Sequence, residues 1–242
     1  ASSMLKLIHA DLYKTFHRAY FFLLTAVVSA LCVVMVFALR GGEAGNWSAA
    51  VSLGAMLLSY PVFLLPMLTQ IIYAEEFRDH TLKNTMSYGT GRTVLYLSKW
   101  LTVIILGVVM TAVVLAFYFG STALVLTRDS AFRWELVREF FVRLSAACAV
   151  YVAAISMSVF FIQLLNKSTL AIFLYYGCFY LSDLILKLLH LDKGIDYLLK
   201  TQISAIAGNP LSNLQTPVVI SLVTMAIFFL AGIVFFRKED FS

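Results

Sequence analysis

The dominant pattern along this chain is a series of six long apolar runs separated by short polar segments. The runs cover residues 19–39, 51–74, 101–126, 144–165, 168–189 and 217–236. Each contains about 20 residues or more, which is the length that a helix needs to cross a hydrocarbon core of about 30 Å. The runs are continuously apolar and do not alternate, which favours helices over the strands of a membrane barrel. The chain is therefore predicted to be an all-α integral membrane protein with six transmembrane helices.

Composition supports a bilayer as the solvent around this chain. Of its 242 residues, 61% are hydrophobic and 13% are charged, whereas a soluble domain carries about 25% charged residues. Residues 1–3, ahead of Met4, are interpreted as a cloning scar, and 4–242 as a single transmembrane domain. The three cysteines all fall inside apolar runs and form no CxxC pair, so they are interpreted as small hydrophobic residues.

The charges near the first apolar run predict the orientation. An even number of crossings puts both termini on one side of the membrane. Lys6, Lys14 and Arg18 precede the first run, which favours a cytoplasmic N-terminus, although the bias over the whole chain is small. The expected topology is N-in and C-in.

Residues 4–18 have the pattern of an amphipathic helix. Leu5, Ile8, Leu12 and Phe16 recur at spacings of three or four, which places them on one face. Such a segment is predicted to lie along the membrane interface ahead of the first span. The alternative is an ordinary basic anchor that only sets the topology.

The segment 75–100 is the densest polar stretch of the chain. Asp79 or Thr81 can cap a short helix that extends through Met86, and Gly89 and Gly91 would end it. A short helix with a mixed surface can dock into a groove on a soluble partner. The alternative is a passive solvated turn between two spans.

A family resemblance bears on this segment. The pattern acid-Phe-Arg-Asp-x-Thr-Leu-Lys-Asn, then Ser-Tyr-Gly-x-x-Arg and Val-Leu-Tyr-Leu-Ser-Lys, resembles the first cytoplasmic loop of ABC-2 type transporter permeases of Gram-positive bacteria. The basic amphipathic start and the ending Gly-Ile-Val-Phe-Phe-Arg-Lys-Glu-Asp-Phe are also similar to that family. His80 stands where the family commonly has glycine.

The resemblance implies a permease subunit in the bacterial plasma membrane. Residues 75–92 would then form a coupling helix that contacts a cytoplasmic ABC ATPase subunit, present in two copies. The coupling residues would be Glu75, Glu76, Phe77, Arg78, Thr81, Leu82, Lys83 and Arg92. No GxxxxGK[ST] loop is present, so ATP and Mg²⁺ would bind the partner subunit and this chain would bind no cofactor.

The same resemblance implies a pair of permease chains, as a homodimer or a heterodimer, around a shared pathway. The many aromatic residues and the few charges within the runs suggest a hydrophobic or amphipathic substrate. Relatives with this layout export amphipathic peptides such as phenol-soluble modulins, bacitracin-like peptides and lantibiotics. An amphipathic peptide is therefore the expected substrate.

Three further features stand out in the apolar part of the chain. Pro61 and Pro66 lie inside the second run and predict a kink, which can serve a gate or only set the shape. Asp183 and Lys187 are four residues apart near the outer end of the fifth run and form either a functional polar pair or an interface marker. The segment 190–216 is predicted to be an interfacial or re-entrant outer helix.

Other function classes were weighed from the same residues. Glu75 and Glu76 with a nearby arginine resemble the paired-glutamate signature of intramembrane proteases, but His80 occupies the position of that family's arginine. The four histidines all lie outside the middles of the runs, so neither a metal site nor a catalytic site is predicted. A channel or a structural scaffold is the other alternative, and no nucleic-acid partner is expected.

Overall fold

The structure is a computed structural model that describes residues 2–43, 45–78 and 91–238. Helices account for nearly all of the secondary structure in these ranges. The elements are α1 (Ser2–Phe16), α2 (Ala19–Arg40), α3 (Trp47–Leu57), α4 (Pro61–Arg78), α6 (Arg92–Val125), α7 (Trp134–Leu165), α8 (Ser168–Tyr180), α9 (Ser182–Leu188), η1 (Asp192–Tyr197), α10 (Leu199–Gly208), η2 (Leu211–Asn213) and α11 (Gln215–Lys238).

Four single helices are long and apolar enough to cross a membrane: α2, α6, α7 and α11. They correspond to the first, third, fourth and sixth apolar runs. The second and fifth runs each form a broken pair. The axes of α3 and α4 differ by 55°, and those of α8 and α9 by 56°. The all-α membrane character is thus confirmed, and the count reaches six crossings if each bent pair is one span.

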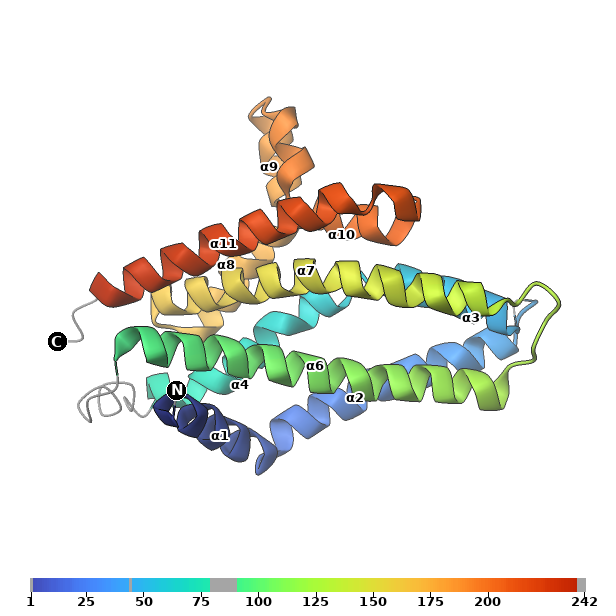
Figure 1. Cartoon of the computed structure of the whole chain (residues 1–242), viewed down its shortest axis with the longest axis horizontal. Helices are drawn as coiled ribbons and strands as arrows, with labels where there is room; N and C mark the ends of the chain where they lie inside the picture. The colour runs from blue at the N-terminus through green and yellow to red at the C-terminus, as the bar shows by residue number, and fades with distance from the viewer. Residues whose placement is uncertain (1, 44, 79–90, 239–242) are drawn as a thin grey trace.

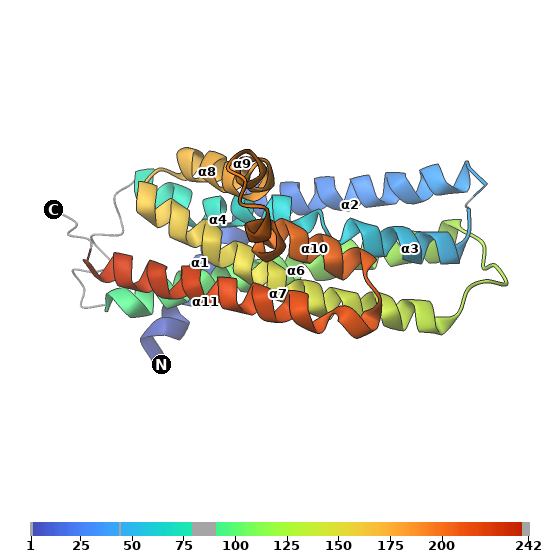
Figure 2. The ribbon, with the colours of Figure 1, turned by 90° about the horizontal axis from the view of Figure 1, so that it is seen from above.

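The long helices lie side by side and give the bundle two distinct ends (Figures 1 and 2). The near end holds α1, the end of α4, the start of α6 and the end of α11. The far end holds the loops that join α2 to α3 and α6 to α7. Both termini of the described chain lie at the near end, as an even number of crossings requires. The compartment that the near end faces stays a prediction.

Helix α7 forms the centre of the bundle and packs against α11, α4 and α8. Several of its inward positions are small: Ala147, Ala153, Ala154 and Ser156 are all fully buried. Small side chains let neighbouring backbones approach closely, which is how helices associate in a membrane. Large apolar side chains such as Leu124 on α6 point outward instead, where lipid can cover them.

A set of hydrogen bonds, here named the far-end clasp, joins the two far-end loops. The hydroxyl of Ser48 donates to Asp129 Oδ2 at 2.6 Å, and the Ser48 amide donates to Asp129 Oδ1 at 3.3 Å. The indole nitrogen of Trp47 donates to the carbonyl of Leu126 at 3.0 Å. The two bonds from Ser48 lower the pKa of Asp129, and the bond from its hydroxyl is the largest cause.

We expect acid to open the far-end clasp. Because the pKa of Asp129 is lowered in the folded protein, its stabilising effect is present near neutral pH and is lost as the pH falls below about 4. Hydrogen exchange at the Ser48 amide, corrected for its intrinsic rate, should lose protection over that range. The variant Asp129→Asn should show no such pH step. A step that persists in this variant would mean that another group titrates.

The break between α3 and α4 is stabilised by tyrosine hydroxyls. Pro61 begins α4, and Pro66 lies inside it. Pro66 has no N–H to donate to the carbonyl of Val62. The hydroxyl of Tyr175, from α8, donates to that carbonyl at 2.8 Å. Within a bilayer a freed carbonyl must find such a partner, so the carbonyl that Pro66 leaves free has a specific donor. The predicted kink is present as the α3–α4 break just before Pro61.

Two more tyrosines act in the same way beside the break. Tyr151 of α7 donates to the carbonyl of Leu58, and Tyr176 of α8 donates to the carbonyl of Phe63 at 2.7 Å. The bend is therefore held by side chains from two other helices. Whether it moves as a gate stays a prediction.

We expect Tyr175→Phe to destabilise the protein by about 1–3 kcal/mol, because the buried carbonyl of Val62 loses its donor. Adding Pro66→Ala restores a backbone N–H four residues after Val62, so the same tyrosine change should cost less in that background. Thermal unfolding of the four proteins of this cycle measures the coupling. Tyr20→Phe, at a tyrosine that is 69% exposed, is the control. Equal costs in both backgrounds would contradict this account.

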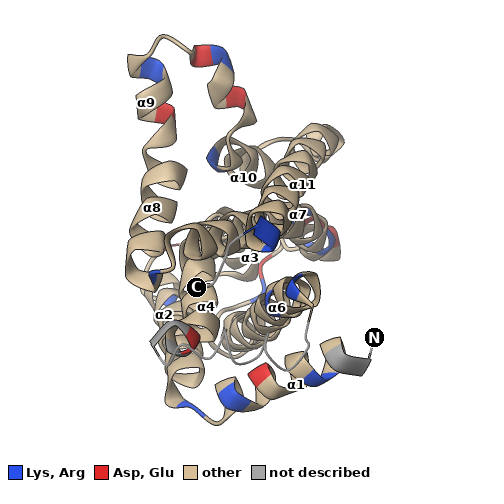
Figure 3. Cartoon of the chain, turned by 90° about the vertical axis from the view of Figure 1, so that its left-hand side faces the viewer, with Lys and Arg blue, Asp and Glu red and all other residues tan. Residues whose placement is uncertain are grey.

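The α8–α9 pair departs from a simple span. Helix α9 projects from the bundle, away from the directions of the long helices (Figures 1 and 3). Asp183 and Lys187, the two polar residues singled out in the fifth run, both lie on α9. Asp183 forms an ion pair with Lys200 of α10 at 3.1 Å, which joins α9 to α10. The segment 190–216 folds as η1, α10 and η2. Arg143 of α7 donates to the carbonyls of Ile206 and Asn209 at the C-terminus of α10.

Candidate functional site

The near end contains a buried ion cluster formed by Asp11, Glu76 and Lys99. Each residue comes from a different helix: α1, α4 and α6 respectively. The ammonium of Lys99 donates to Asp11 Oδ1 at 2.9 Å and also contacts Glu76 Oε1. Lys99 is 2% exposed. We name these three residues the near-end cluster.

Helical spacing explains how the three side chains meet. Lys99 follows buried Leu95 by four residues, on the face of α6 that packs inward. Asp11 lies between buried Ile8 and Thr15 on α1. Glu76 follows buried Ile72 by four residues on α4. Each charged residue thus lies on the buried face of its own helix, one turn from a buried neighbour.

The formal charge of the near-end cluster is not balanced. Two carboxylates face one ammonium, so the fully ionised cluster carries a net charge of −1. Burial raises the pKa of Glu76 most, and the ammonium of Lys99 opposes that rise. A buried ion pair of this kind fixes geometry because breaking it leaves an unpaired charge inside the protein. The cluster therefore holds α1, α4 and α6 in one arrangement.

Polar side chains from α4, α6 and α7 continue the near-end cluster inward. Gln163 of α7 donates to the hydroxyl of Tyr73 at 3.2 Å. Tyr96, fully buried on α6, lies against the backbone of Gly232 on α11. Most of the chain seen from this end is uncharged, with charges on α1, at helix ends and around α9 (Figure 3).

The structure places the predicted coupling residues at the near end as far as it describes them. Glu75, Glu76, Phe77 and Arg78 form the last turn of α4. Of these four, only the side chain of Glu76 is described, and it faces Lys99. Thr81, Leu82 and Lys83 lie outside the described residues.

Arg92 begins α6 and donates to the carbonyl of Arg237 at 2.8 Å. This bond ties the start of α6 to the last turn of α11. It gives Arg92 a structural contact within the chain. A role of Arg92 in contacting an ATPase stays a prediction.

Sequence reasoning missed Asp11 and the structural role of Lys99. Neither residue is among the site residues predicted from the sequence. The available signal was the position of each residue one helical turn from apolar residues that proved to be buried. That signal cannot pair them, because they lie 88 residues apart.

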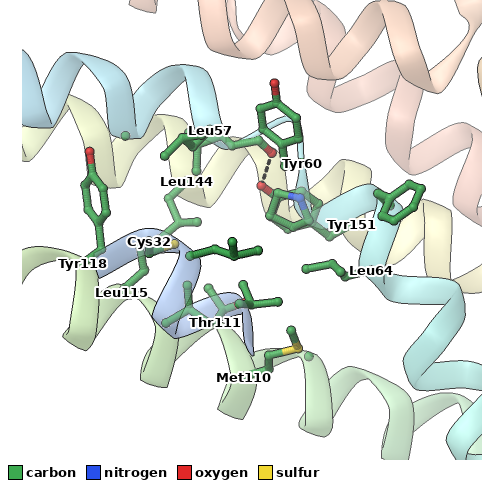
Figure 4. Close-up of a pocket in the computed structure, with 18 of the residues that line it drawn as sticks. Cys32, Leu57, Tyr60, Leu64, Met110, Thr111, Leu115, Tyr118, Leu144 and Tyr151 are labelled. Carbon is green, nitrogen blue, oxygen red and sulfur yellow. Dashed lines mark hydrogen bonds between the residues drawn. The ribbon is translucent and has the colours of Figure 1, made fainter. Parts of the chain in front are cut away.

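An apolar cavity of about 560 Å³ lies between α2, α3, α4, α6 and α7, beside the α3–α4 break. Figure 4 shows Cys32, Thr111 and Leu115 on one side of it and Leu57 and Tyr60 on another. Pro61 also lines the cavity, so a change in the bend would change its shape.

Within the described ranges, no group of three or more His, Cys, Asp or Glu side chains is placed to hold a metal ion. The near-end cluster offers two acids, and its ammonium lies between them.

Comparison with known proteins finds neither a family model nor a curated protein that matches this chain.

Proposed function

We propose that this chain is the membrane-spanning subunit of an ATP-driven ABC exporter of the ABC-2 type. It would act in a bacterial plasma membrane, paired with a second permease chain and two cytoplasmic ATPase subunits. Its substrate would be hydrophobic or amphipathic, an amphipathic peptide being the expected case. The near end would face the cytoplasm.

The observation that carries this proposal is the near-end cluster. It joins α1, α4 and α6 at the point where the chain leaves α4 at Arg78 and returns at Arg92. The intervening residues are those that resemble the coupling segment of the family. A push on that segment would reach α4 and α6 directly, and Asp11 would carry it to α1.

The α3–α4 break is where such a push would change the structure. A force on the C-terminus of α4 would change the angle between α3 and α4, because the two helices do not form one straight helix. The tyrosine bonds to Leu58, Val62 and Phe63 would set how far the bend can change. In this mechanism the change in α4 switches the pathway between the two permease chains from one side of the membrane to the other.

We expect Lys83→Glu to uncouple ATP hydrolysis from export. The test uses the chain co-purified with the ATPase encoded beside it and reconstituted in proteoliposomes with a fluorescent amphipathic helical peptide. Hydrolysis should continue while peptide export falls by about tenfold, the factor that corresponds to 1.4 kcal/mol of lost coupling. Lys193→Glu, at an exposed lysine in η1, is the matched control.

Two results would contradict the proposed function. One is the failure of any ATPase to co-purify with the chain. The other is equal export by Lys83→Glu and Lys193→Glu. Glu76 is unsuited to this test, because reversing its charge would disrupt the near-end cluster and the fold along with any coupling.

A further inference from the structure

The cavity beside the α3–α4 break lies within one chain and has no role in the proposed pathway between two chains. It has a volume of about 560 Å³, within the range of about 300–1,000 Å³ that is typical of ligand pockets. A ligand of this cavity must match the chemistry of the lining, the volume, and the side from which the cavity can be entered.

The walls have little to offer a polar ligand. The hydroxyl of Tyr118 donates to the carbonyl of Ala50 at 2.6 Å, and that of Tyr151 donates to the carbonyl of Leu58. These two hydroxyl protons are therefore already used, and apart from Cys32, Tyr60 and Thr111 the remaining side chains of the lining are apolar. Water needs two to four polar partners, and apolar cavities of this kind stay dry and take apolar guests.

Size discriminates between two apolar guests. An α-helix about 10 Å across that rises 1.5 Å per residue fills about 120 Å³ per residue, so the cavity would hold only about five residues of one. A methylene group is close in size to water, which occupies about 30 Å³, so the same space holds a chain of roughly 18 methylenes. The volume therefore suits one alkyl chain better than a helix of several turns.

Access favours the bilayer as the source of that chain. Three residues that line the cavity are also exposed at its edge: Leu31 on α2, Tyr60 at the break and Phe63 on α4. These residues belong to segments that can span a membrane. Acyl chains of lipids are therefore the apolar groups in direct contact with the edge.

We propose that this cavity binds one acyl chain of a membrane phospholipid, inserted between α2 and α4 against the α3–α4 break. The bound chain fills the space beside Pro61 and keeps α4 at its bend relative to α3. This site does not depend on the proposed transport function, because it needs only that the helices lie in a bilayer.

Photo-crosslinking tests the site directly. The full chain is reconstituted with a phosphatidylglycerol that carries a diazirine near the end of one acyl chain, irradiated, and mapped by mass spectrometry. We expect adducts to concentrate on residues 28–35 and 107–118. Thr111→Trp should fill the cavity and lower that yield by about tenfold, the factor for 1.4 kcal/mol. Val108→Trp, at an exposed position of the same helix, should leave the yield unchanged.

A second measurement does not rely on adding bulk to the protein. Cys148→Ser with Cys178→Ser leaves Cys32 as the single thiol, inside the cavity. Its reaction with a lipophilic maleimide should accelerate after delipidation in detergent and slow again when phospholipid returns. The matched protein that keeps only Cys178, an exposed residue of α8, should not show this reversal.

Three outcomes would overturn the lipid site. The first is adducts spread evenly over the outer faces of α2 and α11. The second is equal yields from Thr111→Trp and Val108→Trp. The third is protection of Cys32 by an amphipathic peptide but not by phospholipid, which would assign the cavity to a peptide. All three leave the ATPase test of the proposed function unaffected.

Discussion

Lys99→Met is expected to cost about 3–5 kcal/mol of folding stability, because it leaves Asp11 and Glu76 buried without their cation. The near-end cluster would then hold two carboxylates in a site that is closed to water. Thermal unfolding of the detergent-purified protein measures the loss. Lys6→Met, at an exposed lysine of α1, should change stability little.

An apolar replacement of the whole cluster separates packing from charge. The triple variant Asp11→Leu, Glu76→Met, Lys99→Met removes all three charges together, so we expect it to regain most of the stability that Lys99→Met loses. If the proposed function holds, the triple variant should still export less, since α1, α4 and α6 would no longer be tied by charge. Stability of Lys99→Met equal to that of Lys6→Met would refute the role of the cluster.

Gly232→Ala is the second change with a large expected effect. A Cβ at this position would lie 2.3 Å from the hydroxyl oxygen of Tyr96 and 2.9 Å from its ring carbon Cζ. Tyr96 is fully buried, so it has no free space to move into. Overpacking of this kind costs about 1–3 kcal/mol, and α11 would have to shift away from α6.

A matched control for this change is Gly120→Ala on α6. No heavy atom lies within 4 Å of the Cβ that it adds. Alanine is favoured over glycine inside a helix by about 0.5–1 kcal/mol, so Gly120→Ala should leave the protein as stable or slightly more stable. Comparing the melting temperatures of the two variants separates the contact with Tyr96 from helix propensity. Equal melting temperatures would mean that α11 does not pack on Tyr96 in the membrane.

The helices could be predicted from sequence because the bilayer imposes a simple rule on composition and length. Each apolar run corresponds to a helix or a broken pair. Pro61 and Pro66 predicted a kink in the second run, and the break lies just before Pro61. Pro66 also frees a backbone carbonyl. The partner of the carbonyl it frees could not be predicted, since Tyr175 lies on another helix and tyrosine has no periodic signature.

Helix α1 shows a contact that apolar periodicity does not reveal. Leu5 of its apolar stripe is 63% exposed, where lipid can cover it, whereas Ile8 of the same stripe is buried. Asp11 is also buried, because it pairs with Lys99 of α6. The pattern of apolar residues within α1 carries no signal for a partner on another helix.

Helix α4, which begins at Pro61 next to the break, can also be considered as a lever. At 18 residues it is about 27 Å long, so a 10° change at its pivot moves the Arg78 end by about 5 Å, close to one helical turn. The near-end cluster lies near the C-terminus of α4, which moves most. The tyrosine hydroxyls lie at the α3–α4 break, which is the pivot. Small rotations there would be amplified into displacements large enough to shift a whole helix against its neighbours. The buried charges of the near-end cluster thus lie where the displacement would be greatest.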